Sequence, residues 1–377
     1  MKNRVIKVLG IALTLSLIMS TLVGCGGSGS DDTFVIGGIG PLTGNAASYG
    51  ISVKQGTEIA IEEINQAGGV TVGDKKIKLD LNFMDDEAKP ENAVTAYNAL
   101  MDDGIDALLG CVTTDSNLAI TDLTYEDGLF ALTPSGSAIE ITKHPNTFRV
   151  CFTDPLQGIT MANFAQEQGY KKIAIMYNNS DNYSTGIMNA FVEQAETNGA
   201  EIVANEAFAS EDIDFNTQLT KIRATDAEVI FVPSYYNEAA NIVTQARESN
   251  MDIPFLGSDG WDGVLSQIVD ASVLEGAIFL TPFLASAEDE ATKSFVEKYQ
   301  EKYDAIPDQF AADGYDGVYI IAAAMEEAGS TDSADLIAAM TKIEVDGLTG
   351  KMTFTADGEP DKEANFAEIK DGEYIAR

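Results

Sequence analysis

The chain alternates short apolar runs with amphipathic stretches of helical spacing, and this alternation restricts the fold more than any other feature. A first series runs from the strand-like Phe34–Ile39, through a helical stretch over 48–67, to the strand-like Leu129–Thr133. A second series of the same kind begins at Lys172–Tyr177 and ends at Phe255–Leu256. Strand–helix alternation is typical of a parallel sheet covered on both faces. We therefore predict an α/β fold with two similar open lobes in tandem.

The C-terminal section follows a different pattern. Helical spacing over 292–303, 310–328 and 333–340 is followed by two strand-like runs, 351–354 and 365–369, with the turn Asp357-Gly358 between them. This pattern predicts a β-hairpin. A hairpin is too small to be a domain, so we expect it to complete one of the lobes.

The N-terminus reads as a secretory signal. Lys2, Arg4 and Lys7 precede an apolar run of about 16 residues, shorter than the ~20 of a membrane-spanning helix. Leu22-Val23-Gly24-Cys25 resembles the bacterial lipobox, in which the cysteine is lipidated after cleavage. We predict a lipoprotein signal peptide over 1–24, a lipid anchor at Cys25, and a flexible tether over 25–32. The expected location is the outer face of the cell membrane; an ordinary signal peptide with a chance cysteine is the alternative.

Composition excludes several classes of partner. The chain has 60 acidic and 23 basic side chains and a net charge of −37, which disfavours binding to nucleic acid and to anionic lipid. With 377 residues, of which 45% are hydrophobic, it can form two cores. Cys111 and Cys151 can form a disulfide or remain buried free thiols, and the sequence leaves both possibilities open.

Signals of catalysis are weak. The single histidine, His144, excludes His-based triads and two-histidine metal motifs. No P-loop is present, and Gly38–Gly44 only imitates a dinucleotide fingerprint. We expect no catalytic residue, no metal and no cofactor, so the chain is not expected to be an enzyme. A hydrolase that uses acidic residues near a cleft is the competing hypothesis.

Polar turns follow four of the predicted buried strands. In open α/β sheets, ligands bind at the carboxyl ends of the strands, where helix N-termini offer N–H groups. One such turn alone is more often a helix cap, but four at matching places in two lobes predict a binding site. Hydroxyls for a carboxylate, Asp259 for an ammonium and tyrosine faces together fit a zwitterion. The turns are 113–116, 133–137, 178–183 and 234–237.

These residues resemble the solute-binding proteins of branched-chain amino-acid (Leu/Ile/Val) ABC importers, a type I periplasmic-binding-protein family. The resemblance covers nearly the whole chain after the signal. It implies two open Rossmann-like lobes joined by a three-segment hinge, one comprising 33–151 plus 281–347 and the other 152–280 plus 348–377. The motifs that carry it are Ile39-Gly-Pro-Leu-Thr-Gly44, Tyr49-Gly50, Asp85-Asp86, Tyr125-Glu126 and Leu132-Thr133-Pro134.

The resemblance also implies a ligand site. The ligand carboxylate is expected to meet the side chains of one lobe, and its ammonium to meet Asp259, where the family usually has Glu. Trp261, close by, is a second departure and is expected near the cleft. The other implied ligand contacts are Thr114, Ser137 and the backbone of Ser135 and Gly136 for the carboxylate, Tyr183 and Tyr235 from the second lobe, and Tyr49 and Phe310 beside the ligand side chain.

The family implies partners as well as a ligand. We expect a monomer that captures a small amino acid, of the branched-chain type first, and delivers it to a membrane permease of an ABC importer. The family also has members for amides, aromatic acids and other small carboxylates. A sensing module with the same lobes is therefore an alternative that the sequence does not separate from transport.

Overall fold

The structure is a computed structural model that describes residues 33–362 and 364–377. The predicted signal peptide, Cys25 and the tether lie outside the described residues. No helix within the described ranges is both long enough and apolar enough to cross a membrane.

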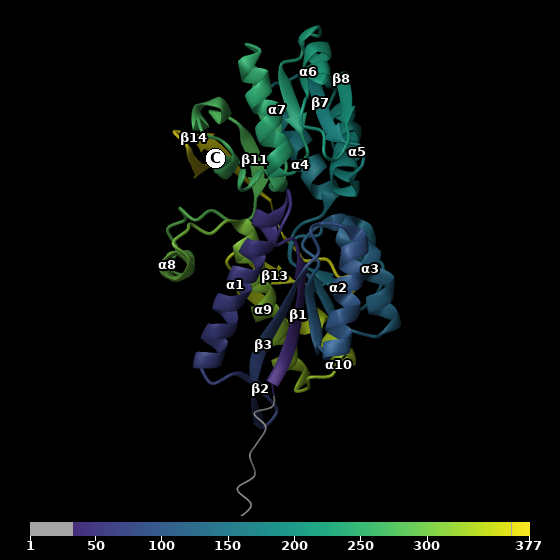
Figure 1. The fold of residues 1–377 in the computed structure, drawn as a ribbon, viewed down its shortest axis with the longest axis vertical. Coiled ribbons are helices and arrows are strands. Elements are labelled where there is room, and N and C mark those ends of the chain that lie inside the picture. Colours follow the sequence, from purple (N-terminus) through teal and green to yellow (C-terminus); the bar gives the residue numbers. More distant parts are fainter. Residues whose placement is uncertain (1–32, 363) are drawn as a thin grey trace, which may run out of the picture. The chain divides into compact units, whose positions relative to one another are not determined.

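The first lobe is built on a six-stranded sheet with the order β2-β3-β1-β4-β5-β6 (Figure 1). Neighbouring strands run parallel except at the edge, where β2 and β3 are antiparallel. The carboxyl ends of β1, β4 and β5 therefore meet at one edge of the sheet. The strands are β1 (Thr33–Gly40), β2 (Val70–Val72), β3 (Lys75–Asp85), β4 (Ala107–Gly110), β5 (Ala131–Thr133) and β6 (Thr147–Arg149).

The second lobe is built on a seven-stranded sheet with the order β15-β14-β11-β10-β9-β7-β8. Its central strands are parallel, and β14 and β15 add an antiparallel edge. The strands are β7 (Lys172–Asn178), β8 (Glu201–Phe208), β9 (Val229–Val232), β10 (Phe255–Gly257), β11 (Ile278–Thr281), β14 (Asn365–Lys370) and β15 (Glu373–Ala376).

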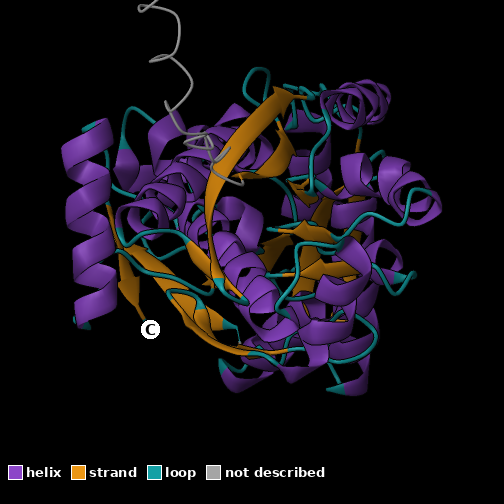
Figure 2. Ribbon diagram, turned by 90° about the horizontal axis from the view of Figure 1, so that it is seen from below, coloured by secondary structure: helices purple, strands orange, loops and turns teal. Residues whose placement is uncertain are grey.

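Helices cover both faces of each sheet, which explains why the strands are apolar on both sides (Figure 2). In β1, Phe34 and Ile36 pack with α1 and α9, whereas Ile39 packs with α2 and α3. In β7, Ile175 faces α4 and α5, and Met176 faces α6 and α7. The helices are α1 (Ala47–Gln66), α2 (Pro90–Asp103), α3 (Thr114–Glu126), α4 (Asp154–Glu167), α5 (Asn182–Thr197), α6 (Asn216–Arg223), α7 (Tyr236–Glu248), α8 (Glu290–Tyr303), α9 (Gln309–Ala328) and α10 (Ser333–Ala339).

Two glycines allow α1 and α9 to lie against each other. A Cβ on Gly56 would lie 1.8 Å from the Ala311 carbonyl oxygen, and one on Gly314 would lie 2.3 Å from the Val53 carbonyl oxygen. Any larger residue at either place would force the two backbones apart. This close packing places the N-terminal ends of both helices, with Tyr49 and Phe310, at the cleft.

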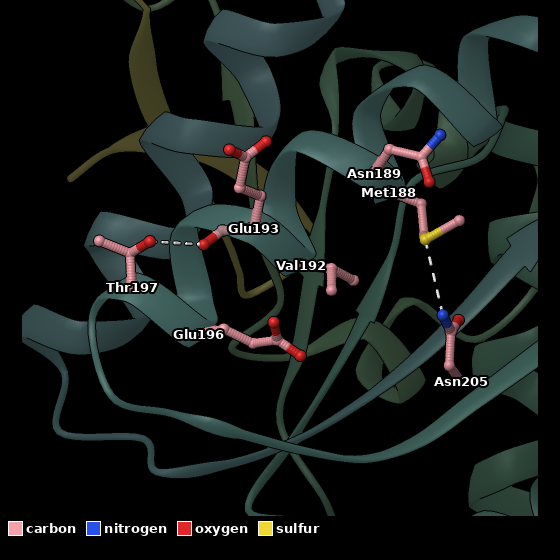
Figure 3. A pocket seen from close by; sticks show the side chains of 7 residues that line it. All are labelled: Met188, Asn189, Val192, Glu193, Glu196, Thr197 and Asn205. Carbon is pink, nitrogen blue, oxygen red and sulfur yellow. Dashed lines mark hydrogen bonds between the residues drawn. The ribbon is translucent and has the colours of Figure 1, made fainter.

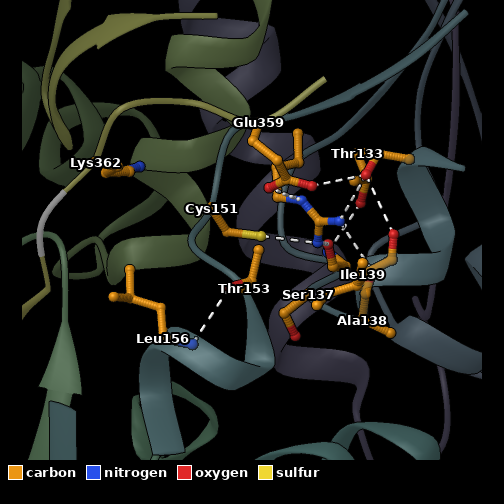
Figure 4. Close-up of polar contacts among 12 residues, drawn as sticks. Thr133, Ser137, Ala138, Ile139, Cys151, Thr153, Leu156, Glu359 and Lys362 are labelled. Atoms are coloured by element: carbon orange, nitrogen blue, oxygen red, sulfur yellow. Dashed lines mark hydrogen bonds and ion pairs between the residues drawn. The ribbon is translucent and has the colours of Figure 1, made fainter. Parts of the chain in front are cut away.

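The chain passes between the lobes three times, after β6, after β11 and before β14, and the first and third crossings are tied together (Figure 4). The Arg149 backbone N–H donates to the Gly358 carbonyl (3.1 Å), and its guanidinium forms an ion pair with Glu359 (2.8 Å). The Lys362 ammonium donates to the Val150 carbonyl (2.8 Å) and lies 3.5 Å from Asp313. Both cations are buried, and each has an acidic partner, so these two crossings form one connected unit.

The predicted hairpin between 351–354 and 365–369 is wrong. The strand β13 (Gly350–Thr353) pairs with β12 (Glu344–Gly347), and β14 pairs with β11 and β15. Met352 and Phe354 are buried in the core of the first lobe, whereas Ala367 and Ile369 are buried in the second, so the two runs cannot pair. The first lobe therefore extends beyond the boundary predicted at residue 347, and the other predicted boundaries stay predictions.

Candidate functional site

Two turns of the first lobe form one wall of the cleft, and Asn117 fixes both of them. Its side-chain oxygen accepts from the Cys111 N–H (2.8 Å), and its Nδ2 donates to the Thr113 carbonyl (2.9 Å) and lies 3.1 Å from Thr133 Oγ1. Across these turns, the Ser137 N–H donates to Thr114 Oγ1 (3.2 Å). The wall therefore presents hydroxyl groups on a backbone that its own hydrogen bonds hold in place.

The second lobe forms the opposite wall from residues that follow β7, β9 and β10. The Tyr183 hydroxyl donates to Asp259 Oδ1 (2.5 Å), lies 2.7 Å from Ser258 Oγ, and accepts from the Gly260 N–H (2.9 Å). The Tyr235 ring stacks on the Tyr183 ring with centroids 4.8 Å apart. Burial raises the pKa of Asp259 to about 6, because a carboxylate is costly to ionise away from water.

Aromatic side chains join the two walls. The Tyr49 hydroxyl, from α1 of the first lobe, donates to the Gly260 carbonyl (2.5 Å) and accepts from the Tyr236 N–H (3.0 Å) of the second. The Tyr49 ring lies against Phe310 of α9, with centroids 4.1 Å apart, and edge-on to Tyr235 at 5.4 Å. Tyr49 is therefore a direct bridge between the lobes.

The structure brings together seven of the nine predicted ligand residues around one cavity of about 10 Å³. That volume suits about one water molecule. An amino acid can enter only if the lobes separate or the aromatic rings turn, so this conformation of the cleft is closed. The role of the seven residues as ligand contacts stays a prediction. The lining residues are Tyr49, Val112, Thr113, Thr114, Ser135, Tyr183, Tyr235, Asp259, Gly260 and Phe310.

Gly136 and Ser137 do not line this cavity. Both backbone polar groups of Gly136 are already used: its N–H donates to Thr133 Oγ1 (2.8 Å) and its carbonyl accepts from Arg149 (2.8 Å). Ser137 is buried, and its hydroxyl has no partner. Of the two, only Ser137 retains an unpartnered polar atom, and that atom is buried away from the cavity.

Trp261 lies in the core of the second lobe, contrary to the expectation that it is near the cleft. Its side chain is fully buried, and its ring nitrogen donates to the Val232 carbonyl (2.8 Å). A Cβ on Gly257 would lie 2.4 Å from this ring, so the glycine makes room for it. Trp261 supports the turn that holds Asp259 from beneath.

Two polar residues beside the site, Asp154 and Gln157, are not among those that the sequence indicated. Both lie in the first turn of α4, directly after the first crossing, and both are buried. Asp154 Oδ1 and Gln157 Nε2 have no hydrogen-bond partner, while Gln157 Oε1 accepts from the Asp259 N–H (3.0 Å). The helix-start signal Thr153-Asp154-Pro155 was present in the sequence, but only the fold reveals their proximity to Asp259.

Cys111 and Cys151, which could have formed a disulfide, are buried free thiols.

A separate, shallow hollow of about 580 Å³ lies between α5 and β8, and none of the predicted ligand residues lines it (Figure 3). It draws no residue from the first lobe. Its lining is Met188, Asn189, Val192, Glu193, Glu196, Thr197 and Asn205.

Comparison with known proteins agrees with the two-lobed architecture. Residues 33–373 match the periplasmic binding protein family. The chain belongs to that family. It is 29% identical to Leu/Ile/Val-binding protein homolog 3 of Brucella melitensis, covering 93% of this chain and 95% of that protein.

Solved structures extend the comparison to three dimensions. The chain is similar to the branched-chain amino acid transporter substrate-binding protein LivJ of Streptococcus pneumoniae, in complex with isoleucine (31% identity, TM-score 0.85, 92% of this chain and 98% of that one). A solute-binding protein of an ABC transporter from R. palustris, in complex with benzoate, shares the fold at 22% identity (TM-score 0.82, 91% and 97%). The periplasmic binding protein fold therefore occurs with ligands of different charge.

Proposed function

We propose that the protein is the solute-binding component of an ABC importer, which captures a small amino acid between its lobes. The observation that carries this proposal is the pairing of walls: the threonines Thr113 and Thr114 line one side of the cavity, and Asp259 lines the other. A zwitterion offers a carboxylate to the first and an ammonium to the second.

The preferred ligand is an amino acid of the branched-chain type. Support comes from the relatives named for leucine, isoleucine and valine and from the isoleucine complex of LivJ. The aromatic lining from Tyr49 and Phe310 offers an apolar surface to such a side chain. Binding shifts the equilibrium between open and closed lobes, since only the closed form contacts the ligand from both sides.

We further propose that the protein acts at the cell surface. Cys25 anchors it by lipid to the outer face of the membrane, residues 25–32 serve as a tether, and the closed monomer delivers its cargo to a permease. A Cys25→Ala variant tests the anchor: the protein is expected to leave the membrane fraction while its ligand affinity stays the same. Retention of the variant in the membrane would contradict the lipid anchor.

Thermal unfolding of the full chain against a library of amino acids and small carboxylates tests the binding function. A ligand at about 100 times its Kd stabilises the native state by about 2.7 kcal/mol, which raises Tm measurably. We expect a branched-chain amino acid to give the largest rise. No rise in Tm with any amino acid would contradict the proposal. A rise with aromatic acids alone would show that the ligand is an aromatic carboxylate and not an amino acid.

A further inference from the structure

A second hollow lies beside the aromatic cavity, and we call it the vestibule. Its volume is about 330 Å³, and it shares Thr113 and Tyr235 with the cavity, so the two are adjacent. Residues of both lobes line it, which means that closure of the cleft forms it. Its charged lining residues are Glu87, Lys89 and Asp115 from the first lobe and Asp181, Glu211 and Glu238 from the second.

The vestibule is strongly acidic, and its one cation is already used. The Lys89 ammonium forms an ion pair with Glu87 at 2.7 Å. Asp115 receives only a neutral donor from the opposite lobe, the Asn182 amide (2.6 Å). When the cleft closes, carboxylates of the first lobe approach carboxylates of the second. This approach disfavours the closed state unless a positive group enters between them.

Unpartnered polar atoms point to an occupant. Thr113, a lining residue of the vestibule, is only 5% exposed, and its buried hydroxyl has no hydrogen-bond partner. Glu238 Oε2 is also buried without a partner. Burial and the neighbouring carboxylate of Asp115 raise the pKa of Asp181 to about 8, and burial raises that of Glu238 to about 6. The group as a whole lacks a compensating cation.

The spacing of these carboxylates favours an organic group over a metal ion. Among the described residues, no three acidic, histidine or cysteine side chains converge closely enough to hold a metal ion. Carboxylates spread around about 330 Å³ instead suit an ammonium or guanidinium, which is larger and needs no fixed coordination geometry.

We propose that the vestibule is a cation-selective subsite of the cleft, which, among amino acids with polar side chains long enough to reach it, favours a positively charged distal group over a neutral one and a neutral group over a negatively charged one. This inference rests on the proposed function, since it concerns the side chain of an amino acid held by the main cavity. The protein should therefore bind arginine more tightly than its neutral isostere citrulline, and glutamine more tightly than glutamate.

Calorimetric titration of the full chain with these two pairs tests the proposal. In the wild-type protein, arginine is expected to bind about tenfold or more tightly than citrulline, and glutamate about tenfold or more weakly than glutamine. Both ratios should shrink severalfold in Glu238→Gln and in Asp181→Asn. The Asn side chain still accepts from the Tyr183 N–H, so the start of α5 is preserved.

Glu193→Gln is the matched control, because it makes the same carboxyl-to-amide change at an exposed site on α5, outside the vestibule (Figure 3). It should leave both ratios unchanged. The proposal is overturned if the members of each pair bind equally in the wild type, or if the ratios persist in both vestibule variants. In those cases the amino-acid site itself stands, whereas binding of no amino acid at all would remove the proposed function as well.

Discussion

The two walls of the cleft differ in chemistry. The first-lobe wall is lined by the hydroxyl residues Thr113 and Thr114, on turns that Asn117 and Thr133 hold rigidly. The second-lobe wall presents Asp259 under two stacked tyrosines. One wall can donate to an anion without changing its own charge, and the other can accept a cation. This asymmetry suits a dipolar solute that lies across the cleft, because neither wall alone satisfies both ends.

The walls also differ in how stable they are without a ligand. Hydroxyl groups carry no charge, so their burial costs little when they donate to nearby carbonyls, as Ser135 does to Val112 (2.7 Å). Asp259 is buried at 5% exposure, and its raised pKa shows that its charge is poorly compensated. Ligand binding should therefore stabilise the acidic wall more than the hydroxyl wall, because only the acidic wall carries a poorly compensated charge.

The largest effect is expected from the acidic wall. Asp259→Asn should weaken amino-acid binding by about 2–5 kcal/mol, because the ligand ammonium loses a desolvated charged partner. Isothermal titration calorimetry measures it. Tyr183→Phe, which removes a hydrogen bond to Asp259 but not the carboxylate, is the matched control and should cost less. Equal affinity in wild type and Asp259→Asn would take Asp259 out of the site.

A smaller loss is expected from the hydroxyl wall. Thr114→Val keeps the shape of the side chain and removes its hydroxyl, so binding should weaken by about 1.5–3 kcal/mol, the range for a hydrogen bond to a charged group. Thr114→Ser keeps the hydroxyl and should bind nearly as well as wild type. If valine and serine variants behave alike, the hydroxyl has no role in holding the carboxylate.

Acidification should act on one wall and leave the other unchanged. The pKa of Asp259 is about 6, so ligand affinity should fall by up to about tenfold for each pH unit below that value.

The folding stability of the ligand-free protein should instead increase on acidification. Asp181 and Asp313 have pKa values raised to about 8, and Asp259 and Glu238 to about 6, so the native state binds more protons than the unfolded state between pH 4 and 8.

The stabilising contribution of these groups is thus complete below their unfolded pKa near 4 and is lost as the pH rises through 6 to 8. We expect Tm of the ligand-free protein to rise on going from pH 8 to pH 5, and ligand affinity to fall over the lower part of that window. Affinity of Asp259→Asn should be nearly independent of pH there. A Tm that falls steadily on acidification would contradict the assignment of these buried carboxyls.

The smallest effect concerns the bridge between the walls. Tyr49→Phe removes the hydroxyl that bonds to the Gly260 carbonyl and the Tyr236 N–H, so the closed state should lose about 1 kcal/mol. Fluorescence energy transfer between one dye on each lobe should then report a larger open fraction without ligand. An unchanged open fraction would mean that the bridge does not hold the lobes together.

Local patterns predicted most of this structure. Each predicted buried strand of the two series is a strand, and the turns after them contribute residues to one cavity, because parallel strands align their carboxyl ends. The failures arose where distant partners decide. The run 365–369 pairs with β11 rather than with 351–354, and Arg149 occupies the carbonyl of Gly136. Nothing local to either segment contains that information.

Burial was the other quantity that sequence could not supply. Trp261 stands two residues after Asp259, yet one faces the core and the other the cavity. In the sequence, Asp154 and Gln157 look like ordinary residues at the start of a helix. In the fold they are buried beside Asp259, and one polar atom of each has no hydrogen-bond partner. Unpartnered buried atoms become visible only when every neighbour is in place.

Titration with three related solutes shows whether the cleft binds both ends of a zwitterion. They are the tightest-binding amino acid, the corresponding acid without its amino group, and the corresponding amine without its carboxyl group. We expect each analogue to bind the wild-type protein about a hundredfold or more weakly than the amino acid does. An acid or amine that binds as tightly as the amino acid would contradict it.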